Sequence, residues 1–207
     1  MTMEQNVELI TTDGISIAAS YFKGESTKGI IFLHQLASSK ESWNKLINEL
    51  TEYHMIAIDL RGHGASDLEW GSFNDKDFNN MINDIEAAEK YLKEKKVTEI
   101  GIIGASIGAN LAIKYGVDHN LKTVVALSPG LNYRGIDIDE NSAMLNIPTL
   151  IVVGDGDGYS TETSSTIYGS IPNEEKELLE LHNKLHGVNM LDKALINKIK
   201  EWLKKYL

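Results

Sequence analysis

The amino-acid sequence predicts an α/β protein with a doubly wound, mostly parallel sheet that starts with an antiparallel hairpin and carries helices on both faces. The hairpin is indicated by Asp13-Gly14, a dipeptide that favours a tight turn, between the strand-like segments VELITT and ISIAASYF. Five later apolar segments lack polar alternation, which is typical of parallel strands buried on both faces. They read GIIFLH, MIAIDL, EIGIIG, TVVALS and TLIVVG.

Helical periodicity between these segments gives a β-α-β-α order. We expect helices over residues 41–50, 77–95, 106–115 and 189–207, and a last strand over 176–181. Gly116 is expected to stop the third of these helices. In doubly wound sheets ligands bind beyond the carboxyl ends of the strands, so we expect the chemistry there.

Composition limits the classes of function. The 207 residues, 42% of them hydrophobic, suffice for one domain, and we expect residues 1–207 to form it. A formal net charge of −10 disfavours nucleic acid and anionic membranes as partners. The absence of cysteine excludes disulfides and a cysteine nucleophile. With no targeting segment and no apolar run near ~20 residues, a cytoplasmic location is expected.

The segment Gly104-Ala105-Ser106-Ile107-Gly108 has the G-x-S-x-G pattern of a nucleophile elbow. It follows an apolar strand and precedes a helical pattern, as a sharp strand-to-helix turn requires. Only small residues two positions before and after the serine avoid collision with the neighbouring strand and helix, hence Gly104 and Gly108. The turn exposes the serine hydroxyl and directs the Ile107 N–H toward it, where it can stabilise an oxyanion.

Four further segments, before and after the elbow, carry motif-like residues at the ends of predicted strands or in the loops that follow them. In chain order they are IIFLHQLASSKESW, DLRGHGAS, IPTLIVVGDGD and Leu185-His186-Gly187. With the elbow, they make the sequence resemble the α/β-hydrolase family over nearly its whole length. The resemblance implies that Ser106 is the nucleophile, Asp157 the acid and His186 the base of a catalytic triad. It also implies that the backbone N–H groups of Leu36 and Ile107 form the oxyanion hole.

The sequence departs from the family at two positions. Gln35 stands where the family usually has glycine, and Leu185 stands where glycine often precedes the histidine. Gln35 is expected to narrow the pocket or reach the oxyanion, so it is a candidate substrate contact, whereas Leu185 is expected to affect local packing.

Other residues near these motifs have alternative interpretations. Asp155 could replace Asp157 as the acid, although we favour Asp157. The run from Asp155 is no calcium loop, because its fifth, sixth and twelfth positions hold Tyr159, Ser160 and Thr166. We expect His34, His63 and Arg61 to fix loops. No histidine pair has metal-helix spacing, so no metal and no cofactor are expected.

Only residues 128–148 separate the strands TVVAL and TLIVV, where many family members insert a helical cap. A nearly absent cap leaves an open cleft, which favours a carboxylesterase for small, soluble esters or thioesters. Tyr133 and Met144 are candidate substrate contacts. Two alternatives stay open: an acyltransferase or perhydrolase with the same triad, and a non-catalytic ligand-binding protein of the same fold. The oligomeric state is not predicted.

Overall fold

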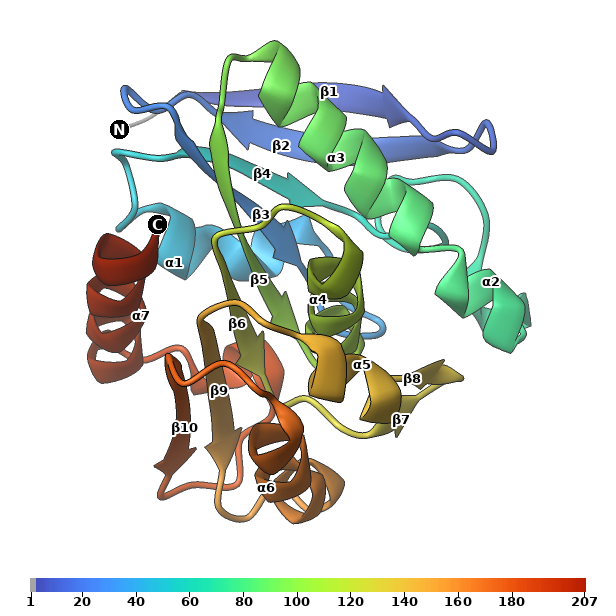
Figure 1. Cartoon of the computed structure of the whole chain (residues 1–207). Helices are drawn as coiled ribbons and strands as arrows, with labels where there is room; N and C mark the ends of the chain where they lie inside the picture. The colour runs from blue at the N-terminus through green and yellow to red at the C-terminus, as the bar shows by residue number, and fades with distance from the viewer. Residues whose placement is uncertain (1–2) are drawn as a thin grey trace.

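The computed structural model describes residues 3–207, which form an eight-stranded sheet with helices on both sides (Figure 1). The strand order is β1-β2-β4-β3-β5-β6-β9-β10. In this order the strands are β1 (Glu4–Ile10), β2 (Ser16–Phe22), β4 (His54–Ile58), β3 (Lys28–Leu33), β5 (Glu99–Ala105), β6 (Thr123–Leu127), β9 (Thr149–Gly154) and β10 (Lys176–Leu181). All eight predicted strands are confirmed, counting the two of the hairpin and the last one over 176–181.

The sheet is antiparallel at one end and parallel over the rest. β1 pairs with β2 through a turn at Gly14, whose φ of +83° suits glycine, and β2 pairs antiparallel with β4. The pairs β4–β3, β3–β5, β5–β6, β6–β9 and β9–β10 are all parallel. The carboxyl ends of these six strands therefore meet at one edge of the sheet.

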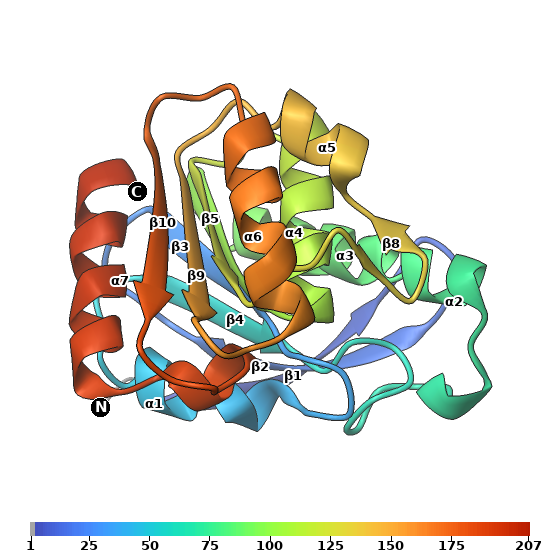
Figure 2. The same ribbon diagram turned by 90° about the horizontal axis from the view of Figure 1, so that it is seen from below.

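The helices cover the two faces as separate layers, which Figure 2 shows from below. On one face lie α3 (Ile82–Glu94), α4 (Ile107–Asp118) and α6 (Tyr159–Ser170), and on the other lie α1 (Asn44–Ile47) and α7 (Lys193–Tyr206). The remaining elements are α2 (Asp75–Asn79), α5 (Asp139–Met144), a small hairpin of β7 (Asn132–Tyr133) and β8 (Ile136–Asp137), and 3₁₀ turns over Lys40–Trp43, Trp70–Ser72 and Gly187–Met190.

Two hydrophobic cores fill the space between sheet and helices. Along β3, Ile31 and Leu33 belong to the core under α3 and α4, while Ile30 and Phe32 belong to the core under α1 and α7. Because alternate side chains of a strand point to opposite faces, both faces of β3 are buried. This burial is the reason why the strand sequences show no polar alternation.

Two predicted helices are broken in the structure. The expected helix over 41–50 is a 3₁₀ turn followed by the four-residue α1, and the one over 77–95 is split into α2 and α3. The split has a local cause, because the amide of Asn79 donates to the carbonyls of Asp75 and Gly135 and so ties the end of α2 to the β7–β8 hairpin. Asn80 and Met81 then link the two helices.

The prediction that Gly116 stops α4 is wrong. The helix continues to Asp118, and a Cβ at position 116 would lie 3.0 Å from Leu145 Cδ1 and 3.2 Å from Val124 Cγ2. Glycine is present here because β6 and the segment after α5 pack close to the helix, not because the chain turns.

Residues 128–148 contain the β7–β8 hairpin and α5. None of the helices in the described part of the chain has both the length and the apolar character needed to span a membrane. A cytoplasmic location stays a prediction.

Candidate active site

Ser106 occupies a strained turn between β5 and α4. Its φ of 53° and ψ of −117° lie in a region that residues other than glycine rarely adopt. The Ser106 N–H donates to the Leu127 carbonyl at 2.8 Å, and the Ser106 carbonyl accepts from Ala109 N–H at 2.9 Å. The neighbouring strand and the first turn of the helix thus hold the strained residue in place.

The two glycines of the elbow are required by close backbone approach. A Cβ at Gly104 would lie 2.1 Å from the Gly108 carbonyl oxygen, and a Cβ at Gly108 would lie 2.4 Å from the Leu33 oxygen. Real Cβ atoms essentially never come within 3.0 Å of such atoms. The absence of both side chains allows α4 to begin directly against the ends of β5 and β3.

His186 and Asp157 are joined across the ends of β10 and β9. The imidazole Nδ1 lies 2.9 Å from each carboxylate oxygen. The Asp157 side chain is 10% exposed and that of His186 is 35% exposed, so the pair lies at the surface with the carboxylate beneath the ring. The backbone N–H of Asp157 donates to the Gly154 carbonyl and to Thr161 Oγ1, which fixes the turn that carries the carboxylate.

The other aspartate of this loop makes a different contact. Asp155 Oδ2 lies 2.5 Å from Nδ1 of His182, whose side chain is fully exposed. The structure therefore brings Asp157, and not Asp155, to His186.

The loop of His186 packs beside the elbow. Gly187 N–H donates to Ser128 Oγ at 2.9 Å, and a Cβ at Gly187 would lie 3.3 Å from that of Ala105, the residue before Ser106. Ser106 is 8% exposed. In the described part of the chain no hydrogen bond joins His186 to Ser106. The three predicted triad residues thus follow β5, β9 and β10 at the same edge of the sheet, with β6 between β5 and β9, and one pair among them is hydrogen-bonded.

The two predicted oxyanion donors are unused. Over residues 3–207 neither Leu36 N–H nor Ile107 N–H donates to a protein acceptor. Two hydrogen bonds of His34 hold the loop of Leu36: Leu60 N–H donates to His34 Nε2 at 3.0 Å, and His34 Nδ1–H donates to the Gln35 carbonyl at 2.7 Å. Burial lowers the pKa of His34 to about 4, so the ring is neutral near pH 7.

The predicted substrate contacts have different environments. Gln35 Oε1 accepts from Val188 N–H at 3.0 Å. The ring of Tyr133 lies edge-on to His186 with centroids 6.4 Å apart, and its hydroxyl is 2.7 Å from Ser160 Oγ. Met144 ends α5 and is 55% exposed, and the chain then runs to the amino end of β9, away from the other residues. Substrate contact stays a prediction for all three, and the placement of Met144 gives it no support.

Arg61 and His63 lie in the loop after β4 and hold it. Arg61 is 3% exposed and binds Asp13 and the fully buried Asp84. His63 stacks on Trp70 with centroids 5.7 Å apart, and its Nδ1 bonds to the Arg61 carbonyl. Within the described residues, neither side chain forms a hydrogen bond with the His186 loop.

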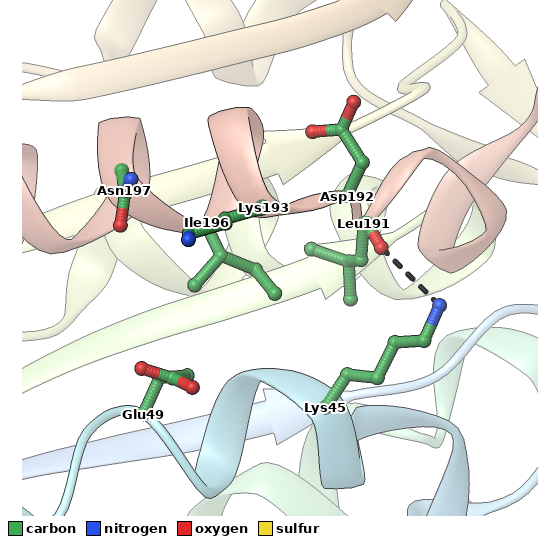
Figure 3. A pocket seen from close by; sticks show the side chains of 7 residues that line it. All are labelled: Lys45, Glu49, Leu191, Asp192, Lys193, Ile196 and Asn197. Carbon is green, nitrogen blue, oxygen red and sulfur yellow. Dashed lines mark hydrogen bonds between the residues drawn. The ribbon is translucent and has the colours of Figure 1, made fainter.

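A hollow of about 400 Å³ adjoins the site. It is lined by Gln35, Ser38, Glu41, Ser42, Asn44, Lys45, Val188 and Asn189. A second hollow, of about 480 Å³, lies between α1 and α7, where Lys45 Nζ reaches the Leu191 carbonyl at 3.5 Å (Figure 3). Its lining shares Lys45 with the first hollow and holds none of the predicted site residues.

The described residues hold no group of three or more histidine, aspartate or glutamate side chains that could bind a metal ion. The sequence interpretation missed one residue of this site, Ser128, which has a φ of 51° and contacts the His186 loop. It directly follows β6, so its place at the carboxyl end of a strand was the available signal.

Comparisons with known proteins agree with this architecture. A family model described as alpha/beta hydrolase fold matches residues 29–142. A putative 2-succinyl-6-hydroxy-2,4-cyclohexadiene-1-carboxylate synthase of Bacillus subtilis is 26% identical over 133 residues, which cover 62% of this chain and 47% of that protein. Its namesake from Haemophilus influenzae is 33% identical over 99 residues, 45% of this chain and 35% of that protein. The matched stretches thus span less than half of these relatives.

Solved structures are similar over the whole chain. An esterase from Pyrococcus furiosus has a TM-score of 0.83 and 21% identity, covering 99% of this chain and 92% of that one. A thermophilic esterase from Thermogutta terrifontis, with malate bound, has a TM-score of 0.79 and 17% identity, covering 98% and 99%. At these identities the likeness shows a shared fold.

Proposed function

The chain belongs to the α/β-hydrolase family, and from this premise we propose that it is a serine hydrolase whose nucleophile is Ser106, whose base is His186 and whose acid is Asp157. The observation that carries the proposal is the hydrogen-bonded pair of His186 and Asp157 beside the strained Ser106. Strained backbone of this kind gathers at functional sites, because the surrounding structure must hold it in place.

The chemistry follows from the roles of the three side chains. A serine hydroxyl is a poor nucleophile until a neutral imidazole accepts its proton. Asp157 accepts from Nδ1–H of His186, which leaves the Nε2 lone pair free to take that proton. The Ser106 oxygen attacks the ester carbonyl, and His186 then gives the proton to the leaving alcohol. Water, deprotonated by His186, releases the acid from the acyl-enzyme.

The negative oxygen of each tetrahedral intermediate needs donors already in place. Leu36 and Ile107 supply two backbone N–H groups that no protein acceptor occupies within residues 3–207. Ile107 is the first residue of α4, so the positive end of the helix adds to the stabilisation. Loss of one such donor typically reduces turnover by about 10²–10³.

For the substrate class we propose small, soluble carboxylic esters or thioesters. We also propose that residues 1–207 form one domain, in which residues 128–148 stand where a cap would be inserted. Because this segment is short, it offers little apolar surface to surround a long acyl chain. The adjoining hollow of about 400 Å³ has mostly polar side chains, which suits a polar acyl or alcohol group. The expectation of no nucleic-acid or membrane partner stays a prediction.

Labelling with a fluorophosphonate, followed by peptide mapping, tests the site. We expect a label on Ser106 in the wild type and in the control Ser165→Ala, which changes an exposed serine of α6. Ser106→Ala should abolish the label, and His186→Gln should slow it strongly. A label on any other serine would overturn the assignment.

Initial rates with nitrophenyl esters from acetate to decanoate test the substrate class. We expect acetate or butyrate to be preferred, and a preference for decanoate would refute the open-cleft argument. Added alcohols or hydrogen peroxide that compete with water for the acyl-enzyme would identify an acyltransferase or perhydrolase. Labelling without turnover of any ester would favour the ligand-binding alternative.

A further inference from the structure

The backbone after His186 is held by two side chains from distant parts of the chain. Gly187 N–H donates to Ser128 Oγ at 2.9 Å, and Val188 N–H donates to Gln35 Oε1 at 3.0 Å. The acceptors lie 59 and 153 residues away in sequence, at the carboxyl ends of β6 and β3. Two consecutive N–H groups of the histidine loop are thereby fixed to the central sheet.

The local backbone is shaped for this contact. Gly187 has a φ of +56°, and a Cβ there would lie 2.2 Å from Gln35 Oε1, so the Gln35 side chain fills the space that any other residue would need. Gln35 is itself anchored, because its carbonyl accepts from His34 Nδ1–H and from Ser38 N–H. A glycine at position 35, which has no side chain, could not make this contact.

We propose that Gln35 and Ser128 are positioning residues that clamp the His186 loop, so that the imidazole is held within reach of Ser106 through the catalytic cycle. This inference rests on the proposed function. Asp157 restrains the ring at Nδ1 alone, while the position of its Cβ depends on the backbone that Gln35 and Ser128 hold.

Gln35 also couples two parts of the site. Its side chain holds the loop of the base, and its main chain directly precedes Leu36, whose N–H is the proposed oxyanion donor. A change that frees the side chain therefore affects both the base and the oxyanion hole. Reaction rates are sensitive to such changes, because a displacement of about 1 Å can reduce the rate about 10²-fold.

The main test compares two substitutions of Gln35. Gln35→Met keeps the length of the side chain and removes the acceptor, and we expect kcat to fall about 10- to 100-fold with KM within about twofold. Gln35→Glu keeps an acceptor oxygen at the same reach, and we expect it to restore most of the lost kcat. The matched control is Gln5→Met, at the other glutamine of the chain, on the exposed edge strand β1.

Ser128→Ala tests the second contact. Serine and alanine have the same Cβ, so the strain at a φ of 51° is unchanged and only the acceptor is lost. Because both residues hold one loop, the double variant Gln35→Met/Ser128→Ala should lose less kcat than the product of the single losses.

Amide hydrogen exchange provides a readout that does not require turnover. In Gln35→Met the Val188 amide should exchange at least about tenfold faster than in wild type, and in Ser128→Ala the Gly187 amide should do so. Unchanged exchange in both variants would refute the clamp. A raised KM with unchanged kcat in Gln35→Met and Gln35→Glu would refute it in favour of direct substrate contact. Failure of Ser106 labelling in the wild type would instead refute the proposed function.

Discussion

Asn110 and Gly130 exchange two hydrogen bonds: Asn110 Nδ2 donates to the Gly130 carbonyl at 2.7 Å, and Gly130 N–H donates to Asn110 Oδ1 at 3.1 Å. The same amide donates to the Ile136 carbonyl at 3.0 Å. Asn110 lies in α4, the helix that follows Ser106, and the β7–β8 hairpin carries Tyr133 beside His186. One fully buried side chain thus ties α4 to the hairpin next to His186.

We predict that Asn110→Ala lowers the free energy of unfolding by about 2–4 kcal/mol, because it leaves three buried backbone groups without partners. Urea unfolding followed by circular dichroism measures the change. Asn197→Ala, at an exposed position of α7, is the control and should change stability by less than about 0.5 kcal/mol. Equal effects of the two substitutions would show that the buried amide does not hold the hairpin.

Substitution of glycine by alanine should have opposite effects on stability at Gly108 of the elbow and at Gly169 of α6. Gly108→Ala places a Cβ 2.4 Å from the Leu33 oxygen and 2.8 Å from the His34 oxygen, so α4 must move away from β3. We expect a loss of about 1–3 kcal/mol and at least about tenfold lower esterase activity. Gly169→Ala, in α6 with nothing within 4 Å, should instead stabilise by about 0.5–1 kcal/mol. Activity that survives Gly108→Ala unchanged would contradict the packing argument.

The strands could be predicted because a strand buried on both faces has an apolar sequence without polar alternation. Helix α6 has no comparable sequence pattern. Its sequence YSTETSSTIYGS has few strong helix formers, and we did not predict this helix. It forms because Ser160, Ser164 and Ile167 are buried against the sheet, while the Ser164 hydroxyl bonds back to the Ser160 carbonyl. Tertiary packing here outweighs local propensity.

The same distinction applies to the site. The order of the motifs identified Asp157 and His186, which the structure joins at 2.9 Å. The contacts of Gln35 and Ser128 with the histidine loop could not be predicted, because they depend on how strands far apart in sequence are placed side by side. The sequence showed Gln35 only as a departure from glycine, and it gave no sign that the side chain would bind the Val188 N–H.

A third prediction concerns the loop after β4. Arg61 donates to Asp13 and to Asp84, which is 0% exposed, so Arg61→Met leaves a buried carboxylate without its partner. We expect a loss of about 3–5 kcal/mol. Arg61→Lys should not rescue it, because one ammonium cannot reproduce the forked contacts of the guanidinium.

The double variant Arg61→Met/Asp84→Asn should recover much of that loss, because the charge is removed with its partner. Lys200→Met, which breaks the exposed pair with Glu49, should cost at most about 1 kcal/mol. Thermal and urea unfolding of the wild type and the four variants separate these cases. A double variant no more stable than Arg61→Met would show that the charge of Asp84 is not the cause.

The last prediction concerns acid stability and His34. Burial lowers the pKa of His34 to about 4, against 6.5 for an unperturbed imidazole. Between these values the unfolded chain binds a proton that the folded chain does not. Stability therefore falls as the pH drops below 6.5, and the loss from this residue levels off below about 4. From pH 7.5 to 5 this one histidine should account for about 2 kcal/mol.

Urea unfolding of wild type and His34→Gln at pH 7.5 and pH 5 measures this contribution. Glutamine offers an amide donor and acceptor near the positions of the ring nitrogens and does not titrate, so the variant should lose about 2 kcal/mol less than wild type over this interval. Burial also lowers the pKa of His63 and His54, but both residues are present in the two proteins and their effects cancel in the comparison. If both proteins lose the same stability, His34 takes up its proton in the folded state as readily as in the unfolded one, and the neutral ring that joins Leu60 to Gln35 cannot be what fixes the loop of Leu36.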